Sequence, residues 1–496
     1  MITIPGSPVR FCDRISRRGF LRIGGLGAAG LALPELFRAR ALASGRGAVR
    51  GAGRAKSCIL LFMGGGPPQM DTFDLKPDAP AEVRGIFPPI ATSVPGTRIS
   101  ALLPRLAQQA HRYAIIRSVS DEYTGGAHGQ SVYLALTGHK NPRVSGDDIR
   151  PAADDYPNMG SAVARLLGAG HALPPHVWLL DMHRRQFAGE GGGFLGQSCD
   201  PFRILQDPSR PDFRVQALAP PREVPLERFG QRRGLLEHLQ RQGDQILPRR
   251  AMDAHQERAF NMILAPQTQR AFDLNAEPAL VRDRYGRTKF GQGALLARRL
   301  IEHGVPLVTV YWNGEEVPGG WDLHYRNAQY LPVLAPQLDG GFSALLDDLS
   351  ARGLLDETLV VWMGEFGRAP LIEREGGRGH WGRCYSVVLA GAGIHPGIVH
   401  GRSDRRAAFP VKGAVSPQDL VTTIYHCLGI GTDTELTDAL GRPLKLCQGT
   451  PIQGDRRIEA RSGGCKAVVT TARKLAERVY RLLKYGQEYV RQSAAA

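Results

Sequence analysis

Several patterns that would assign a function class are missing from this sequence. None of the seven cysteines belongs to a Cys-x-x-Cys pair, so a metal site built from thiolates is not expected. The sequence also has no glycine-rich phosphate loop, no dinucleotide-binding fingerprint and no nucleic-acid-binding module. Beyond the N-terminal region, no apolar run indicates a membrane-spanning helix. Carboxylate and imidazole side chains therefore remain as the candidates for a functional site.

The N-terminus predicts export of the protein. Residues 16–22 (SRRGFLR) match a twin-arginine signal, and a Gly/Ala/Leu-rich apolar stretch follows at 23–33. The small-residue site at 41–43 predicts cleavage after Ala43. A buried helix or membrane anchor is the alternative, but the run is well short of the roughly 20 residues that a bilayer requires. We therefore expect a periplasmic or secreted protein that meets the twin-arginine export machinery, and at most one or two disulfides.

Much of the positive charge belongs to the two ends of the chain. The formal net charge is +16, of which residues 1–43 contribute +5 and residues 455–496 contribute +6. The body from 44 to 454 keeps an ordinary balance of +5, so the overall charge is a poor argument for nucleic-acid binding. The basic segment 455–496 has near-helical apolar spacing. It is either a solvated helix packed on the body or a helix that binds a membrane surface or protein partner.

The body predicts an α/β fold with three αβα layers and a mainly parallel sheet. Apolar strand-like runs alternate with amphipathic helical patterns, which is typical of a helix-covered parallel sheet. Segment 185–285 changes in composition and is interpreted as an inserted cap region that covers one sheet edge. The predicted strands are 58–63, 113–117, 176–180, 306–311, 358–362 and 386–390, and the predicted helices are 288–304, 336–352 and 416–428.

A spaced set of carboxylates and imidazoles follows these predicted strands. Its members are Asp71, Asp322, His324, Glu365 and His380. Borderline and hard divalent metals bind such oxygen and nitrogen ligands, and open α/β sheets place their sites at the carboxyl ends of strands. The set therefore predicts a site for one or two divalent ions, with zinc, manganese or calcium as the candidates.

The motifs resemble a bacterial family called domain of unknown function 1501. The likeness runs from the leader to about residue 454 and rests on several short motifs, namely MGGG (63–66), DTFD (71–74), RSV (117–119), LARRL (296–300), WDLH (321–324), GEFGR (364–368) and RGHW (378–381). This family is similar to the alkaline phosphatase and sulfatase superfamily. The resemblance implies that superfamily's fold, with metal ligands on loops at the strand ends.

The resemblance also implies roles for single residues. Asp71 would bind one metal, while Asp322, His324 and His380 would bind the other, and Glu365 would supply an acid after a late strand. Two departures stand out. Phe366 replaces a histidine, which leaves the second metal position one imidazole short, and Gly379 replaces an acid that usually precedes the last histidine.

The group that attacks the substrate is not fixed by the sequence. The loop 121–129 contains Thr124, which is either a nucleophile or a helix cap, and His128, which could be a ligand, a general acid or a replacement nucleophile. Arg368 is predicted to pair with a carboxylate or an anionic substrate. Cys199 begins a Cys-x-Pro-x-Arg pattern that sulfatases convert to formylglycine, but its late position favours a structural or free thiol.

Two functions remain open from the sequence. The first is an exported metal-dependent hydrolase of phosphate or sulfate esters, carried by small molecules or polysaccharides. The second is a non-catalytic secreted protein that binds a metal or ligand on the same fold and works with a surface partner through its basic tail. The departure at Phe366 favours the second hypothesis.

Overall fold

A computed structural model describes most of the body of the chain. The described residues are 53–141, 143, 150–168, 173–180, 187–218 and 262–452, with positions 228, 230, 231, 234 and 235 between them. The predicted signal and its cleavage site, most of the charged stretch around 228–258, and the basic segment 455–496 lie outside these residues. The structure therefore tests the sheet and its loops.

A mainly parallel sheet of eight strands forms the centre of the protein, as predicted. Strand β11 is antiparallel to both of its neighbours, and every other pairing is parallel, so seven strands share one direction. Across the sheet, the order is β12 (Val399–His400), β4 (Tyr113–Val119), β11 (Tyr385–Gly391), β8 (Thr358–Met363), β1 (Ser57–Met63), β7 (Leu307–Trp312), β5 (His176–Leu179) and β6 (Phe202–Ile204).

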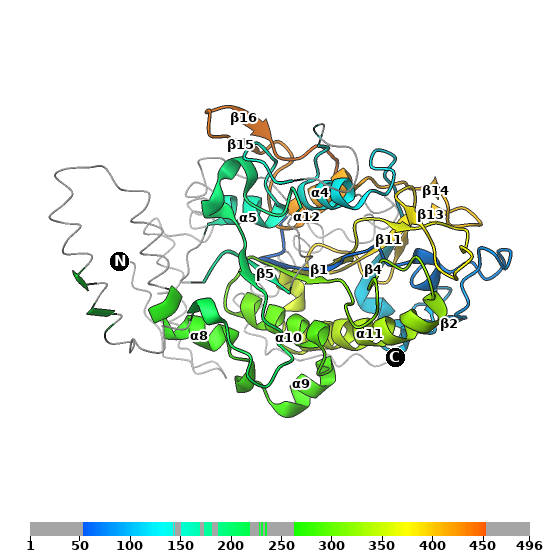
Figure 1. Ribbon diagram of the computed structural model, residues 1–496, viewed down its shortest axis with the longest axis horizontal. Helices are drawn as coiled ribbons and strands as arrows, with labels where there is room; N and C mark the ends of the chain where they lie inside the picture. The colour runs from blue at the N-terminus through cyan, green and yellow to red at the C-terminus, as the bar shows by residue number, and fades with distance from the viewer. Residues whose placement is uncertain are drawn as a thin grey trace, which may run out of the picture.

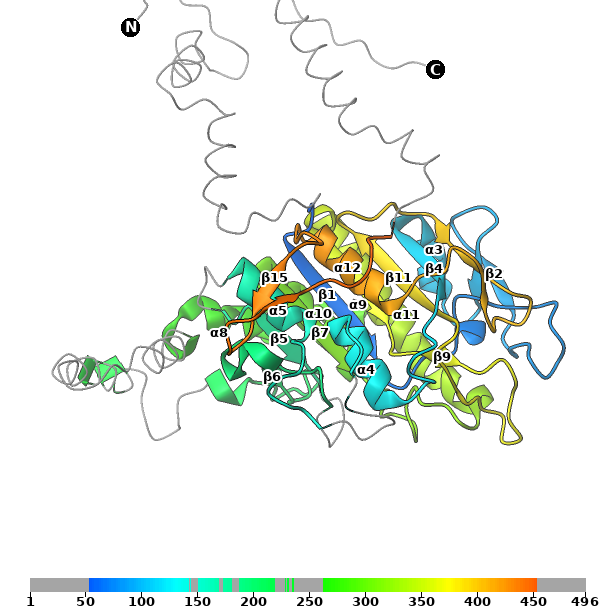
Figure 2. The ribbon, with the colours of Figure 1, turned by 90° about the horizontal axis from the view of Figure 1, so that it is seen from above.

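Helices cover both faces of this sheet and complete three layers, as Figures 1 and 2 show. One face carries α3 (Pro104–Gln108), α8 (Pro266–Phe272), α9 (Ala279–Tyr285), α10 (Lys289–Glu302) and α11 (Asn327–Ala351), and the other carries α4 (His128–Thr137), α5 (Met159–Leu167) and α12 (Pro417–Cys427). Alternate residues of β1 face the two layers, as strand geometry requires. Ile59 and Leu61 pack on the α10 and α11 side, whereas Leu60 and Phe62 pack on the α4 and α12 side.

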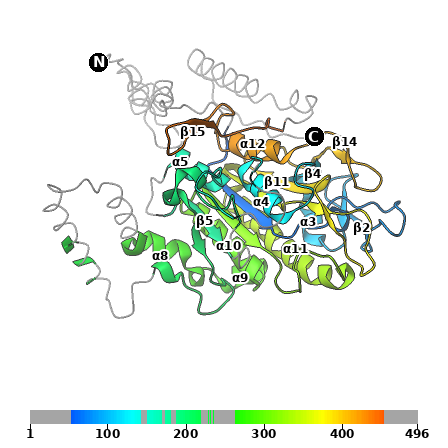
Figure 3. The ribbon, with the colours of Figure 1, turned by 45° about the horizontal axis from the view of Figure 1, so that its top comes forward.

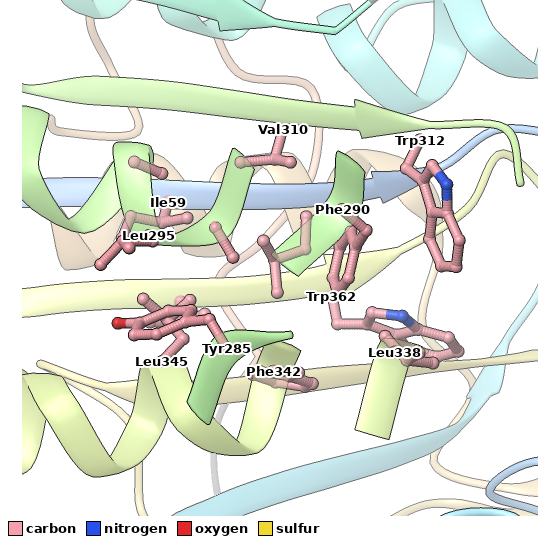
Figure 4. Close-up of a cluster of buried hydrophobic side chains, with 14 of the residues drawn as sticks. Ile59, Tyr285, Phe290, Leu295, Val310, Trp312, Leu338, Phe342, Leu345 and Trp362 are labelled. Carbon is pink, nitrogen blue, oxygen red and sulfur yellow. The ribbon is translucent and has the colours of Figure 1, made fainter. Parts of the chain in front are cut away.

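The larger core lies between the sheet and the pair α10 and α11. Figure 4 shows Phe290, Trp312 and Trp362 among the aliphatic side chains of this layer. The rings of Phe290 and Trp312 are stacked with centroids 4.7 Å apart. Large aromatic side chains bury much apolar surface, each stabilising the fold by about 1.5–3 kcal/mol. This core holds the carboxyl ends of β7 and β8 in fixed positions.

Helix α11 begins earlier than predicted. It spans Asn327–Ala351, and both Pro332 and Pro336 lie inside it, although proline usually marks the first turn of a helix. Leu331 and Leu334 are fully buried and extend the apolar stripe of the helix toward its N-terminus. Packing against the core therefore outweighs the local cost of the two prolines.

Segment 185–285, predicted as a cap region, contributes the edge strand β6 to the sheet itself. Short hairpins and 3-10 turns complete the described structure. The hairpins are β2 (Pro89–Ala91) with β3 (Arg98–Ser100), β9 (Gly367–Arg368) with β10 (His380–Trp381), β13 (Arg402–Ser403) with β14 (Pro410–Lys412), and β15 (Glu435–Thr437) with β16 (Pro443–Lys445). The 3-10 turns are Gln69–Asp71, Ala110–Arg112, Gly193–Leu195, Gln197–Cys199, Gln216–Leu218, Leu274–Ala276 and Leu355–Glu357.

Two general properties follow from the described residues. The five cysteines among them, Cys58, Cys199, Cys384, Cys427 and Cys447, are free thiols. No helix in the described part of the chain combines the length and the apolar composition that crossing a membrane requires.

Candidate functional site

The strand directions bring distant loops to one edge of the sheet. The carboxyl ends of β1, β4, β7 and β8 share this edge because these strands are parallel to one another. Strand β11 runs the opposite way and therefore begins at the same edge, directly after the β9–β10 hairpin. Of the predicted residues, Asp322 and His324 follow β7, Glu365 follows β8, and His380 lies on β10.

Three ligand atoms of these residues converge in a small triangle. Asp322 Oδ1 lies 3.0 Å from His380 Nε2 and 3.1 Å from His324 Nε2, and the two imidazole nitrogens are 2.9 Å apart. Protons alone cannot satisfy all three contacts. If both nitrogens carry a proton, two N–H groups face each other. If only one does, the lone pair of the other nitrogen faces the carboxylate, and if neither does, the two lone pairs also face each other. A single cation among the three atoms would satisfy them all.

His128 approaches Asp322 from another direction. It is the first residue of α4, after a turn in which Gly125 and Gly126 have positive φ angles of 61° and 88°. Its Nε2 lies 3.3 Å from Asp322 Oδ2, and its Nδ1 lies 2.9 Å from Glu365 Oε1. The ring of His128 therefore bridges two carboxylates that come from different strands.

These residues form a group that could hold a metal ion. One ligand atom each from His128, Asp322 and His380 lies within 4.8 Å of the others, and His324 joins Asp322 and His380 through the triangle. Metal bonds of about 2.0–2.2 Å place neighbouring ligand atoms roughly 3 Å apart, which agrees with the triangle's edges. His128, Asp322, His324 and His380 are called the ligand cluster below.

Glu365 lies behind His128 and outside the triangle. Its Oε1 accepts the N–H of Gly65 at 2.8 Å and contacts His128 Nδ1, whereas the buried Oε2 has no hydrogen-bond partner among the residues that the structure describes. A carboxylate that accepts from one imidazole nitrogen leaves the other nitrogen free to bind a metal. The structure therefore places Glu365 as a partner that orients His128.

The charged forms of His128 and Asp322 stabilise each other. Burial disfavours the charged form of His128, but hydrogen bonds to Asp322 and Glu365 and the charges of both residues raise its pKa to about 10. Burial likewise opposes ionisation of Asp322, yet the hydrogen bonds from His128 and His380 and the charge of Arg368 hold its pKa far below the usual range. Burial lowers the pKa of His324. When no metal is bound, these interactions favour the protonated form of His128, whose positive charge would occupy the carboxylate of Asp322 in place of a metal ion.

Arg368 lies beneath the ligand cluster with its side chain fully buried. Its guanidinium donates to the carbonyls of Gly65 and Gly66 after β1, to those of Trp321 and Arg378, and to Asp322 Oδ1. These contacts direct the buried guanidinium to the protein's own carbonyls and to Asp322. Arg368 therefore links the loops after β1 and β7 to the segment before β10, and it pairs with Asp322.

Asp71 takes part in a separate buried pair. Its Oδ2 accepts from Nε of Arg378 at 3.2 Å, and both side chains are almost fully buried. Arg378 also donates to the carbonyls of Val83, Ala369 and Pro370. Burial raises the pKa of Asp71, although Arg378 opposes this shift. Sequence reasoning missed Arg378, and its only signal was a charged residue two positions before His380.

The hydroxyl of Thr124 makes three hydrogen bonds within the protein. It donates to Asp121 Oδ2 at 2.6 Å and accepts from the hydroxyl of Ser131 at 2.8 Å and from the N–H of Gly126 at 3.3 Å. The N-cap position of α4 belongs to Ala127, so Thr124 is not the cap residue. Instead, it organises the turn that delivers His128.

Phe366 packs directly on the ligand cluster. Its ring centroid lies 4.5 Å from that of His380 and 4.9 Å from that of His128, and the side chain is buried. The second departure from the family pattern is Gly379, which replaces an acid. A carboxylate lies near this position nevertheless, because Oε1 of Glu373 is 2.8 Å from where a Cβ on Gly379 would be. An aromatic wall therefore stands where the resemblance implies another imidazole.

Cys199 lies far from the ligand cluster along the strand direction. It precedes β6, which is parallel to β5, so it is located at the amino-terminal edge of the sheet. The ligand cluster occupies the opposite, carboxyl-terminal edge. The thiol is free and half-buried, and this position agrees with a structural or free cysteine.

Comparisons with known proteins identify the family to which the chain belongs. A family model described as protein of unknown function (DUF1501) matches residues 55–455, and no curated protein matches the sequence. The protein is similar to a solved structure named Ps i-CgsB, with 11% identity, a TM-score of 0.38, and coverage of 79% of this chain and 74% of that one.

Two further solved structures are similar over comparable lengths. The lipoteichoic acid synthase LtaP from Listeria monocytogenes has 11% identity, a TM-score of 0.35, and coverage of 82% of this chain and 77% of that one. The sulfatase PsFucS1 from Pseudoalteromonas sp. has 12% identity, a TM-score of 0.34, and coverage of 76% and 68%.

Proposed function

The chain belongs to the DUF1501 family of proteins of unknown function, and from this premise we propose that it is an exported, metal-dependent hydrolase of phosphate or sulfate esters. The observation that carries the proposal is the triangle of Asp322 Oδ1, His324 Nε2 and His380 Nε2, with edges of 2.9–3.1 Å. A cation among these three atoms would satisfy all three contacts, which supports a metal site.

The donor set favours zinc or manganese over calcium. Calcium prefers six to eight oxygen ligands, whereas the ligand cluster offers three imidazoles and one carboxylate. Imidazole suits zinc and other transition metals, and carboxylate oxygen suits manganese and zinc. His128, Asp322, His324 and His380 would hold one ion, and Glu365 would keep the proton on Nδ1 of His128 so that Nε2 is free to bind.

The second metal position implied by the resemblance lacks support from side-chain placement. Asp71, its expected ligand, is paired with the buried Arg378, and the ring of Phe366 fills the space beside His128 and His380. We therefore propose a single ion.

A bound ion would polarise an ester oxygen and lower the pKa of a water molecule at the site. The protein's own groups restrict which nucleophile can attack. Thr124 donates its proton to Asp121 and accepts two further hydrogen bonds, so no lone pair is presented to a substrate. We propose that water attacks, and that Arg368 acts as a positioning residue by fixing Asp322 and the glycine loop after β1.

Export through the twin-arginine route belongs to the same proposal. It is supported by residues 16–22 and by the apolar stretch that follows. This route moves folded proteins, so the ligand cluster could be loaded with metal before export. N-terminal sequencing of exported protein should give a start after Ala43, and an intact Met1 start would refute this part.

Metal analysis combined with one matched pair of variants tests the proposal. Wild-type protein should contain about one zinc or manganese ion and hydrolyse aryl phosphate or aryl sulfate esters. His380→Ala should lose both the metal and the activity, whereas His395→Ala should lose neither, because His395 is exposed outside the ligand cluster. Fully loaded wild-type protein that hydrolyses no ester in a broad panel would refute the hydrolase proposal.

That result would favour the second function, a non-catalytic metal-binding protein. The packing of Phe366 on both imidazoles is the observation that favours it, because it leaves a single ion. Metal-free wild-type protein would refute both functions.

A further inference from the structure

Exposed basic side chains gather on the β13–β14 hairpin and on the segment that follows β10. They are Arg383, Arg402, Arg405, Arg406 and Lys412, called the basic surface below. Both strands of the hairpin pack near β4, and Figures 1 and 3 show β14 on the right-hand side of the molecule, above β2. Trp381, which follows His380, donates a hydrogen bond to the carbonyl of Ala408 in the hairpin, so the basic surface lies beside the segment that carries His380.

The charges of the basic surface are not neutralised within the described part of the chain. None of the five side chains forms an ion pair there. Asp404 is the one acidic residue of the hairpin, and its Oδ1 accepts the backbone N–H groups of Arg406 and Ala408, each at 2.9 Å. Five cations with one internally bonded carboxylate make a surface that attracts anions.

Aromatic rings hold one of these cations in place. The guanidinium carbon of Arg383 lies 5.8 Å from the ring centroids of both Trp381 and Phe409. Trp381 is fixed by a hydrogen bond from Nε1 to the carbonyl of Ala408 at 2.7 Å, and Phe409 is 41% exposed. A guanidinium held near aromatic rings loses less conformational freedom when it binds an anion, and its two N–H groups can engage two oxygens.

The basic surface is continuous with the proposed site through the chain itself. Trp381 follows His380 directly on β10, and β10 pairs with the β9 strand that contains Arg368. A ligand with several anionic groups can therefore place one group at the ligand cluster and others on the basic surface. A small monoester could not reach both.

We propose that the basic surface binds the neighbouring anionic groups of a sulfated or phosphorylated polysaccharide whose scissile ester lies at the ligand cluster. This substrate class rests on the proposed hydrolase function. Charge complementarity requires a polyanion, and Trp381, fixed by its hydrogen bond, together with the nearby guanidinium of Arg383 would offer an aromatic ring and a two-pronged donor to a sugar that carries a sulfate or phosphate. The β13–β14 hairpin also exposes Phe409 and Val411, so an anionic lipid surface is the competing partner that the vesicle experiment below distinguishes.

Binding of dextran sulfate, with uncharged dextran as the reference, tests the proposal on the full chain. The triple variant Arg383→Gln, Arg405→Gln and Arg406→Gln should bind at least about tenfold more weakly at 0.1 M salt. Its slope of log affinity against log salt should fall by about two. The basic segment 455–496 is the same in every variant, so differences between variants report the basic surface.

A control triple variant carries the same change in net charge on other faces. Arg214, Arg270 and Arg284 are exposed and form no ion pair within the described residues, and changing all three to glutamine should alter affinity less than twofold. Equal losses in the two triple variants would show that net charge alone drives binding and would overturn the proposal. So would tighter, patch-dependent binding to phosphatidylglycerol vesicles than to dextran sulfate.

A second readout separates this inference from the proposed function. Asp322→Asn should abolish metal binding and ester hydrolysis while weakening the binding of dextran sulfate much less than the triple variant of Arg383, Arg405 and Arg406 does. If wild-type protein shows no hydrolysis but the two triple variants still differ, the hydrolase proposal fails and the polyanion surface stands. If hydrolysis is present and the triple variants do not differ, the basic surface fails alone.

Discussion

Replacing Glu365 with glutamine should weaken metal binding without unfolding the protein. The carboxylate oxygen Oε1 contacts both Gly65 N and His128 Nδ1. A glutamine keeps an oxygen at that position, so both contacts can persist. It removes the negative charge that makes His128 a better ligand and fixes its tautomer.

The expected loss follows from the place of Glu365 behind a metal-binding imidazole. Partners of this kind change metal affinity by about 10- to 100-fold, which corresponds to roughly 1.4–2.7 kcal/mol of binding free energy. Competition titration of zinc against a coloured chelator would measure this difference. His380→Ala, which removes a direct ligand, should lose considerably more affinity than Glu365→Gln.

Glu375→Gln is the matched control, because Glu375 is an exposed acid on the loop before His380. It should bind zinc as the wild type does. Two results would refute the reasoning on Glu365. Unchanged affinity in Glu365→Gln would show that the residue does not orient His128, and a loss as large as that of His380→Ala would make Glu365 a direct ligand.

Three other outcomes are expected. Asp71→Asn should lower the free energy of unfolding by about 3 kcal/mol, because Arg378 would remain buried without its carboxylate, while metal content stays at the wild-type value; loss of one metal equivalent would instead make Asp71 a ligand. Phe366→His should raise metal stoichiometry above one, since it replaces the ring that fills the space beside His128 and His380 with an imidazole; unchanged stoichiometry would show that Phe366 is not what excludes a second ion. Burial lowers the pKa of His139 to about 4, against an opposing hydrogen bond to the carbonyl of Leu446. Between about pH 6.5 and 4, His139 is therefore protonated in the unfolded chain and neutral in the folded protein. Its contribution to the free energy of unfolding is complete above pH 6.5, and about 3 kcal/mol of it is lost as the pH falls to 4. Urea titrations at pH 7 and pH 4.5 should show this loss in the wild type and not in His139→Gln; equal pH dependence in both would contradict it.

The sequence predicted the sheet well because its strands are short, apolar and bounded by glycine or charged residues. The runs that became β1, β7 and β8 were each predicted to within one or two residues. Strand direction then determines that the residues after these strands meet at one edge. The grouping of Asp322, His324 and His380 could therefore be predicted from order along the chain.

Side-chain partnerships between distant segments could not be predicted in this way. The contact between His128 and Glu365 joins residues 237 positions apart, and that between Asp71 and Arg378 spans 307 positions. Both depend on the final packing of loops and not on any local pattern. For this reason the sequence left the role of His128 open and grouped Asp71 with the ligands, whereas the structure pairs Asp71 with a cation.

The charge balance of the site indicates which ester it would accept most readily. Asp71 and Arg378 cancel each other, as do Asp322 and Arg368, which leaves Glu365 as the uncompensated acid when His128 is neutral. A divalent ion would then give the loaded site a net charge of about +1. A singly charged sulfate monoester or phosphodiester would neutralise it, whereas a doubly charged phosphate monoester would leave an excess negative charge in a partly buried place. We therefore expect kcat/KM for an aryl sulfate or a phosphodiester to exceed that for the phosphate monoester with the same leaving group, and the opposite order would imply a second cation at this edge of the sheet.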